Sequence, residues 1–263
     1  MTSDIFSSIM YMIMKKLLAF FFSVAFLFVA VVAVSAQSEN ANIPERNGDY
    51  AVPGRPDVRV RVFVHEPKER PISASAAICS ADDPSNAIVG PAGWKLPSSI
   101  VNFKVNQSSL PSSLAGMNLA TVAATSFGRW TGAITPASSS PTLTYTGSTS
   151  KTQKALDFEN IITWGRTSGS ALGVTYVWYY TATKLVADVD TIMNKKFPWG
   201  VACTADSYNA ENILVHELGH WFGLNDEYAS VFVNNTMFGY GSKAETKKTT
   251  LSEGDKIGID NLY

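Results

Sequence analysis

The stretch NILVHELGHWFGLNDEY, residues 212–228, holds two of the three histidines of the 263-residue chain. His216 and His220 are four residues apart, so on a helix both imidazoles project from one face and can bind the same metal ion. Glu217 follows the first histidine, where it can act on a water at the metal without being a ligand itself. The pattern predicts a helix that binds a catalytic zinc ion. A helix with two hydrogen-bonded structural histidines is the alternative.

The residues after this helix can supply a third ligand. Gly223 lies three residues past His220, where a helix can end in a left-handed turn that larger residues resist. The chain can then reverse and bring Asp226 beside the two histidines. Two imidazoles and one carboxylate suffice for catalytic zinc, because such sites commonly use three protein ligands and leave a fourth position to water. We expect Asp226 to be this ligand, with Glu227 as the alternative.

The composition restricts the other classes of function. The formal net charge is -1 and the sequence has no block of lysine and arginine, so a nucleic-acid partner is not expected. Hydrophobic residues make up 46% of the chain, which is enough for a sizeable core. The chain therefore has the composition of a folded protein.

The N-terminal segment has the pattern of an export signal. Lys15 and Lys16 precede an unbroken apolar run, residues 17–34, which ends in small residues before Gln37. We interpret residues 1–36 as a signal peptide and expect a secreted, extracellular protein. The run is also just long enough to span a bilayer, so an uncleaved membrane anchor is the alternative. Met14 is an alternative start of translation.

Export has a consequence for the two cysteines, Cys79 and Cys203. In an oxidising compartment they can persist as one disulfide. The alternative is a free Cys79 thiolate that binds the metal in a latent form, since thiolates are good zinc ligands.

Residues 37–92 are interpreted as a leader before the main domain. Residues 37–55 are polar and contain prolines and glycines, which predicts an exposed linker. The alternating run VRVRVFVHE, residues 58–66, predicts a half-buried strand. His65 is expected to be an ordinary surface or edge histidine, not a ligand. A second polar segment follows and predicts a boundary near Gly93.

The main domain, residues 93–263, begins with a predicted strand in the run IVNFKV and a long amphipathic helix in residues 110–130, with Ser112 or Ser113 as its cap. Four further strands are predicted in the runs PTLTYTG, ENIITWG, LGVTYVWYY and KLVADVDTIMN. The metal-binding helix should begin near Ser207 or Asn209.

A last helix is predicted in the segment TLSEGDKIGIDNLY at the end of the chain. Ser252 and Asp255 form an [ST]-x-x-[DE] capping pattern there, ahead of Ile257 and Leu262. This helix would close the domain.

Together these segments resemble a known family of zinc peptidases. The pattern H-E-x-x-H-x-x-G-x-x-D is similar to the metzincin motif with aspartate in the third ligand position. From about Gly93 onward the chain is similar to the matrixins. GWKLPSSIVNFKVN resembles their first strand, TMFGYG their Met-turn and TLSEGDKIGIDNLY their closing helix. An aspartate third ligand also occurs in the snapalysin-like secreted bacterial proteases.

The resemblance implies an α+β fold with a twisted, mostly parallel sheet, an antiparallel edge strand, a long helix, an active-site helix and a C-terminal helix. It makes His216, His220 and Asp226 the zinc ligands, Glu217 the general base and Met237 the apolar floor under the metal. Residues 172–180 would be the edge strand that lines the cleft, where a substrate peptide can add as one more strand. Alternatively, the aromatic residues of this strand only form one face of a sheet.

The sequence also departs from the family pattern. With three histidines it cannot assemble the second, histidine-rich zinc site of animal matrixins, and VPGRPDV has the outline of their P-R-C-G switch without its cysteine. Gly239 occupies the position of the tyrosine that binds zinc in some metzincins, so Tyr240 receives no such role. Calcium is a further possible ion, with Asp188 and Asp190 as candidates; a solvated strand end is the alternative explanation for this pair.

We therefore expect a secreted zinc metalloendopeptidase that acts as a monomer on protein or peptide substrates. Glu217 would take a proton from water and deliver it to the leaving amine. Membrane association is expected only if residues 17–34 stay uncleaved. The alternative is a non-catalytic, zinc-stabilised secreted binding domain. Glu217 argues against it, because purely structural zinc sites tend to be closed by four protein ligands.

Overall fold

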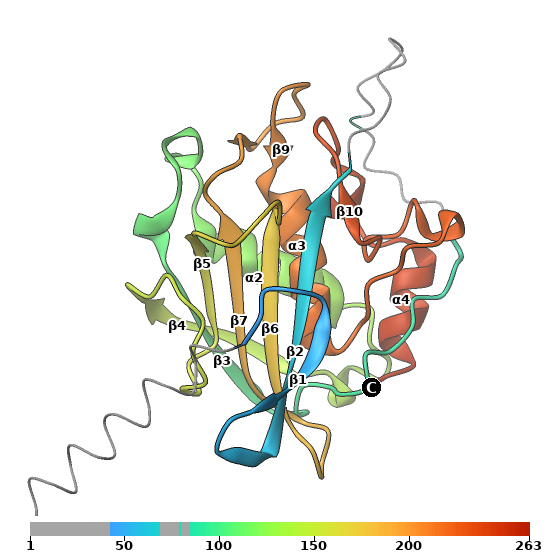
Figure 1. The fold of residues 1–263 in the computed structure, drawn as a ribbon. Coiled ribbons are helices and arrows are strands. Elements are labelled where there is room, and N and C mark those ends of the chain that lie inside the picture. The colour runs from blue at the N-terminus through green and yellow to red at the C-terminus, as the bar shows by residue number, and fades with distance from the viewer. Residues whose placement is uncertain (1–42, 69–78, 80–84) are drawn as a thin grey trace, which may run out of the picture. The chain divides into compact units, whose positions relative to one another are not determined.

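A mixed sheet lies at the centre of the computed structural model, which describes residues 43–68, 79 and 85–263 (Figure 1). The strands follow the order β1-β2-β6-β7-β5-β3-β4 across the sheet, and β10 pairs with the end of β2. Their bounds are β1 (Gly48–Val52), β2 (Arg55–Pro67), β3 (Ile100–Val105), β4 (Thr142–Ser148), β5 (Ile161–Gly165), β6 (Gly173–Tyr180), β7 (Val186–Asn194) and β10 (Tyr240–Gly241). Two short strands, β8 (Trp199–Gly200) and β9 (Tyr208–Asn209), pair separately.

The sheet combines a parallel part and an antiparallel part. Neighbours β4, β3, β5 and β7 are parallel, whereas β6 runs antiparallel to β7 and β2 runs antiparallel to β6. The expected antiparallel strand is therefore present as β6. It is not a free edge in the whole chain, contrary to the expectation for residues 172–180, because β2 and β1 continue the sheet beyond it. On this side the edge strand is β1, which is also antiparallel to its neighbour.

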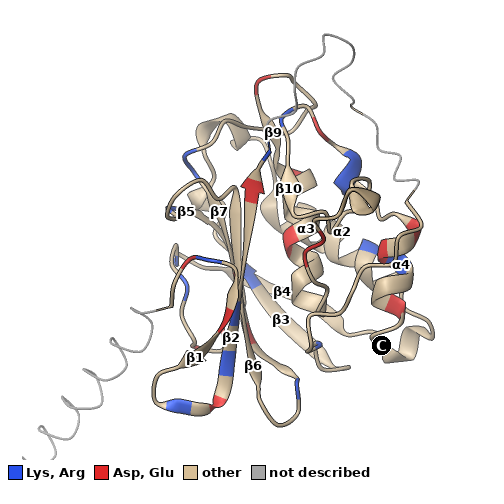
Figure 2. Cartoon of the chain, turned by 45° about the vertical axis from the view of Figure 1, so that its right-hand side comes forward, with Lys and Arg blue, Asp and Glu red and all other residues tan. Residues whose placement is uncertain are grey.

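Three α-helices of the described residues lie on one side of the sheet (Figure 2). They are α2 (Leu119–Thr131), α3 (Ala210–Phe222) and α4 (Glu253–Asp260), as the sequence predicts in number and order. Short 3-10 helices connect the elements: η1 (Gln107–Ser109), η2 (Ser112–Leu114), η3 (Ala137–Ser139), η4 (Ser230–Phe232) and η5 (Lys247–Thr249). Helix α2 turns its apolar face inward, and Phe127 packs against Trp221 and Phe222 of α3. This contact fixes α3 between α2 and the sheet.

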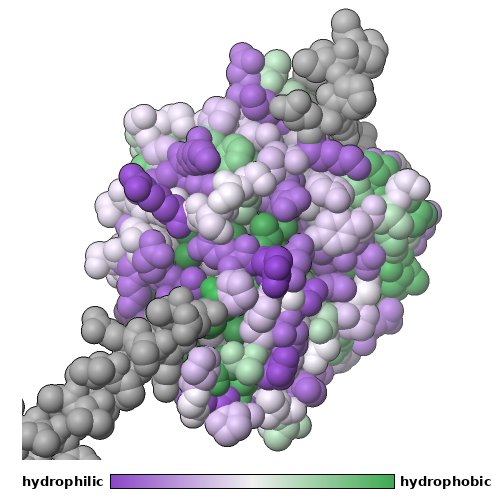
Figure 3. Space-filling view, in the orientation of Figure 1, coloured by the Kyte–Doolittle hydropathy of each residue, from purple (hydrophilic) through white to green (hydrophobic). Residues whose placement is uncertain are grey.

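Apolar side chains gather between the sheet and the helices, where Trp130, Trp164 and Trp221 are fully buried. On the face of the molecule seen in Figure 3, hydrophilic residues predominate between smaller hydrophobic areas. The burial of large aromatic side chains contributes most of the favourable free energy of such a core.

The predicted cap of the long helix is wrong. Helix α2 begins at Leu119, and the cap is Asn118, whose side-chain oxygen accepts a hydrogen bond from the Thr121 N–H at 3.0 Å. Ser112 begins η2 instead. The side chain of asparagine satisfies an N–H of the first helical turn, which is what selects it as the cap.

The interpretation of residues 37–55 as an exposed linker is wrong for Gly48–Val52, which form β1. The strand predicted in residues 58–66 is confirmed as part of β2, and residues Pro44–Tyr263 form one compact unit that includes it. The predicted signal peptide, residues 1–36, lies outside the described residues. Among the helices of the described ranges, none is both long enough and apolar enough to cross a bilayer.

Candidate metal centre

Helix α3 carries the H-E-x-x-H residues, and both of its ends are determined by local chemistry. It begins after Asn209, whose side chain accepts a hydrogen bond from the Asn212 N–H at 2.9 Å, as one of the two predicted starts. It ends at Gly223, which has φ of 100°. A Cβ atom at this glycine would lie 2.0 Å from the carbonyl oxygen of Trp94. A residue with a side chain therefore fits neither the left-handed conformation nor the space.

The turn after Gly223 brings an aspartate to the two histidines. Asp226 Oδ1 lies 3.1 Å from His216 Nε2 and 3.5 Å from His220 Nε2. All three side chains are almost completely buried. Burial and the Asp226 carboxylate act in opposite directions on the histidines: burial lowers the pKa of His216 to about 4, which leaves this imidazole neutral at pH 7.

Backbone carbonyls fix the tautomer of both histidines. His216 Nδ1 lies 2.7 Å from the carbonyl oxygen of Thr236, and His220 Nδ1 lies 2.9 Å from that of Leu224. A carbonyl only accepts, so Nδ1 carries the proton in each ring and Nε2 presents a lone pair. Both lone pairs face the same oxygen of Asp226.

This arrangement fits a zinc ion. Nε2 of His216, Nε2 of His220 and Oδ1 of Asp226 are buried atoms without a hydrogen-bond partner among the described residues, and they lie within 4.8 Å of one another. Around a tetrahedral zinc with bonds of about 2.0–2.1 Å, ligand atoms lie roughly 3.3 Å apart, close to the separations found here. The burial of three unpaired ligand atoms at this spacing costs folding free energy unless a cation binds between them.

Glu227, the alternative ligand, has a different partner. Its Oε1 accepts a hydrogen bond from the Gly90 N–H at 2.9 Å, in the segment that leads to the main domain. Asp226 Oδ2 instead accepts from the Tyr228 hydroxyl at 3.2 Å. The geometry therefore favours Asp226 as the ligand and gives Tyr228 a place beside it, which the sequence motif did not indicate.

Glu217 lies beside the three candidate ligands and is not a member of their group. Its Oε2 accepts a hydrogen bond from the Thr175 hydroxyl of β6 at 2.5 Å, while Oε1 is buried without a hydrogen-bond partner in the described structure. Burial raises the pKa of Glu217 to about 7. Such a carboxyl group can accept and release a proton near neutral pH, as a general base must.

Met237, the residue that the resemblance makes the floor under the metal, packs against helix α3. A Cβ atom on Gly219 would lie 2.3 Å from Met237 Sδ, so the helix has a glycine where the sulfur packs. The N–H groups of Thr236 and Met237 donate to Asp255 of α4 at 2.7 and 3.2 Å. Asp255, which forms the capping box of α4 together with Ser252, thus holds the turn that contains Thr236 and Met237.

A family model described as Matrixin matches residues 101–263, more than half of the chain, and this range includes His216, Glu217, His220 and Asp226. The chain belongs to the matrixins. Membership of this family places it among the zinc metallopeptidases, which are proteases and act on peptides or proteins. No curated protein matches the chain.

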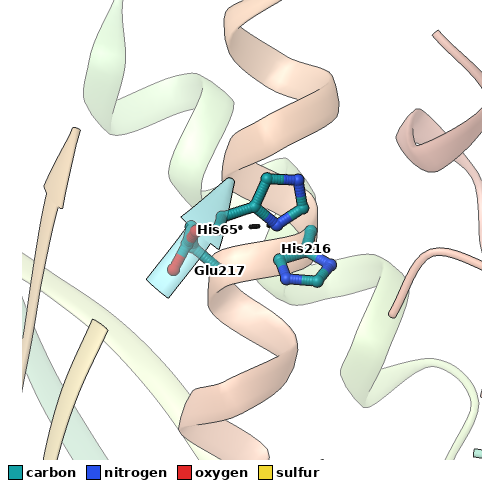
Figure 4. Close-up of side chains that lie close together, drawn as sticks. All are labelled: His65, His216 and Glu217. Carbon is teal, nitrogen blue, oxygen red and sulfur yellow. Dashed lines mark ion pairs between the residues drawn. The ribbon is translucent and has the colours of Figure 1, made fainter. Parts of the chain in front are cut away.

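The prediction that His65 is a surface or edge histidine is wrong for this matrixin, because the residue is buried beside the candidate metal centre. Its side chain is fully buried, and its ring meets that of His216 edge-on with centroids 4.0 Å apart. Nδ1 of His65 lies 4.0 Å from Oε1 of Glu217 (Figure 4). The pairing of β2 with β6 places His65 beside Glu217, and no local sequence pattern predicts that pairing.

Phe63, two residues earlier on β2, stacks on the His220 ring with centroids 3.7 Å apart and an interplanar angle of 5°. The sequence pattern gave no indication of this contact. Both side chains project from the same side of β2, since alternate residues of a strand share a face.

Cys79 and Cys203 form a disulfide, as predicted. The alternative, in which a Cys79 thiolate binds the metal, is contradicted, because neither cysteine is free.

Asp188 and Asp190 of β7 are also buried, so the explanation as a solvated strand end is wrong. Asp188 Oδ2 accepts hydrogen bonds from the N–H groups of Asp157 and Phe158, both at 2.7 Å. Burial raises the pKa of Asp188 to about 7 and raises that of Asp190 as well. One oxygen of each carboxyl group has no hydrogen-bond partner among the described residues.

Proposed function

We propose that this matrixin is a secreted zinc metalloendopeptidase in which His216, His220 and Asp226 hold the metal and Glu217 is the general base. The observation that carries the proposal is the convergence of three buried, unpaired ligand atoms beside a fourth group, Glu217, with a raised pKa. A purely structural site would tend to use four protein ligands. Here the described residues supply three.

The roles of the side chains follow from their positions. Zinc bound at the three ligand atoms would lower the pKa of a water molecule and polarise a carbonyl group. Glu217, held by Thr175, takes a proton from the attacking water and delivers it to the leaving amine. The Thr236 and Leu224 carbonyls keep both imidazoles in the tautomer that binds a metal.

Secretion, a signal peptide at residues 1–36 and a leader at residues 37–92 belong to the same proposal. The Cys79–Cys203 disulfide supports export, because disulfides persist in oxidising compartments. A calcium ion at Asp188 and Asp190 would neutralise two buried carboxyl groups, each with an unpaired oxygen.

One observation favours the second candidate, a non-catalytic, zinc-stabilised secreted binding domain. His216, Glu217 and His220 are 0% exposed, so a peptide does not reach them in this arrangement of the chain. The strand β2 is the cause, since Phe63 and His65 lie directly on these residues.

The test is hydrolysis of a quenched-fluorescent denatured protein by residues 37–263, with added zinc. The chain carries an engineered protease site directly after Lys68, and activity is measured before and after cutting. Glu217→Gln is measured in parallel at matched zinc content. We expect the cut parent to hydrolyse the substrate and the variant to bind zinc but lose at least a thousandfold in rate. Equal zinc binding with no hydrolysis by either would favour the binding domain.

A further inference from the structure

Strand β2 occupies the side of β6 that faces away from the parallel strands. The two strands are antiparallel from Val58 opposite Tyr180 to His65 opposite Gly173. The family match begins at residue 101, so β2 lies outside the matched region while β6 lies within it. Without β2, β6 would present a free edge, and extended peptides add to such edges through main-chain hydrogen bonds. The leader therefore holds a position in which an extended peptide could bind.

The side chains of β2 reach the metal centre from this position. Phe63 lies flat on the ligand His220, and His65 lies against the ligand His216 and the base Glu217. A substrate strand in the same register would place two alternate side chains at the same points.

His65 fills a pocket with closely fitting walls. A Cβ atom added to Gly241 of β10 would lie 2.9 Å from His65 Nε2, 2.9 Å from Leu172 Cδ1 and 2.7 Å from Ile213 Cδ1. The pocket therefore lies between α3, the residue before β6, and β10, and Ile213 and Leu172 form an apolar part of its wall beside His216 and Glu217.

Lys248 supplies a polar group to this pocket. Its ammonium group is fully buried, donates to the carbonyl oxygens of Phe238 and Tyr240 at 2.5 and 2.6 Å, and lies 3.3 Å from His65 Nε2. Burial lowers the pKa of Lys248 to about 8, which keeps the protonated form in the majority at pH 7. An ammonium has three donors, and the third is directed to the side chain that fills the pocket.

We infer that the pocket around His65 is a substrate side-chain pocket that selects glutamate or aspartate, whose carboxylate replaces His65 Nε2 as the partner of Lys248. The inference rests on the proposed function and names its substrate class: acidic peptides that bind antiparallel to β6. A carboxylate makes a stronger, charge-assisted hydrogen bond to an ammonium than a neutral imidazole does. Glutamate, similar in reach to histidine, should fit better than aspartate. In the intact chain β2 fills the pocket, so substrate and leader compete.

The test measures peptide binding directly, so it does not depend on hydrolysis. The zinc-loaded chain cut after Lys68 is separated from the released fragment, residues 37–68. Fluorescence anisotropy then gives the Kd of labelled peptides with the sequence of β2, Arg55–Pro67. The peptides are the parent, His65→Glu and His65→Leu. We expect His65→Glu to bind at least tenfold more tightly than His65→Leu, with the parent between them. Arg59→Leu, which changes the net charge of the peptide by the same amount at a partly exposed position away from the pocket, should bind like the parent.

The enzyme variant Lys248→Met tests whether Lys248 causes the preference for the glutamate peptide. If it folds and binds zinc, the advantage of the glutamate peptide should disappear; if it does not fold, the peptide series on the parent still decides. Equal binding of the glutamate and leucine peptides would overturn the selectivity of the pocket, and no binding of any peptide would overturn the binding position beside β6. Peptide binding in the expected order without hydrolysis would instead remove only the proposed catalytic function.

Discussion

Substitution of Asp255 by asparagine tests how the closing helix supports the metal centre. The carboxylate is fully buried. Oδ2 accepts from the Thr236 N–H at 2.7 Å, the Ser252 N–H at 3.0 Å and the Ser252 hydroxyl at 2.6 Å, and Oδ1 accepts from the Met237 N–H at 3.2 Å. Asparagine offers one acceptor oxygen. If that oxygen takes the position of Oδ2, the amide NH₂ group faces the N–H of Met237.

The magnitude follows from these four contacts. Hydrogen bonds to a charged group contribute about 1.5–3 kcal/mol and neutral ones about 0.5–1.5, so the three retained bonds weaken by about 1 kcal/mol each. The buried Met237 N–H loses its partner, which costs about 1–3 kcal/mol. Removal of a buried charge offsets part of this sum, because the carboxylate no longer has to be desolvated. We expect a net loss of about 3 kcal/mol in the free energy of unfolding.

The substitution should also weaken zinc binding, because the carbonyl of Thr236 orients His216. Loss of such an outer contact typically reduces metal affinity by about 10–100-fold. Urea unfolding and competition with a chelator measure the two effects on residues 37–263. Glu253→Gln is the control: this first residue of α4 has a side chain 57% exposed and should change stability by less than about 0.5 kcal/mol. A loss below about 1 kcal/mol with unchanged zinc affinity would refute the reasoning.

Three further predictions concern single residues. Asp226→Ala should weaken zinc binding at least a hundredfold in a chelator titration, whereas Glu227→Ala should retain it; the reverse order would make Glu227 the ligand. The pKa of Asp188 is raised from 3.8 to about 7 in the folded state, which therefore binds more protons than the unfolded state between these values. Its contribution to stability is present below about pH 4 and lost as the pH rises toward 7, so Asp188→Asn should unfold in urea with a flatter pH dependence; equal slopes would contradict this. Gly223→Ala should cost at least about 2 kcal/mol in the same assay, because φ is 100° and a carbonyl lies 2.0 Å from the new Cβ. The control Gly128→Ala, with nothing within 4 Å, should stabilise α2 by about 0.5–1 kcal/mol, and similar effects at both glycines would contradict the argument.

The sequence was informative wherever the determining interactions are local. Asn209 and Gly223 mark the ends of α3, and Ser252 with Asp255 forms the capping box of α4, because each cap bonds within one helical turn. The turn that brings Asp226 to the histidines is likewise local, because it begins at Gly223, three residues earlier. Ser112 failed as a cap because Asn118, nearer to the apolar residues of α2, bonds to the first turn instead.

The sequence was uninformative where strands pair over long separations. The run VRVRVFVHE predicts a strand that is buried on one face, yet residues 62–65 of β2 are buried without alternation. Their partners in β6 lie more than one hundred residues later, and α3 covers them from still further along the chain. Nothing within the run specifies that neighbour. His65 and Lys248 meet across 183 positions for the same reason.

The position of the disulfide decides what a break in the leader does. Cys79 lies within the leader and is bonded to Cys203 of the main domain. The leader is therefore joined to the main domain twice, by the backbone and by this disulfide. A break between Lys68 and Cys79 yields two separate polypeptides, and β2 is then held by non-covalent contacts alone. A break between Cys79 and Ser85 leaves the fragment with β2 attached until the disulfide is reduced. Gel electrophoresis with and without a reductant would distinguish the two positions of the break. The fragment with β2 separates without reductant after a break before Cys79, and only with reductant after a break beyond Cys79.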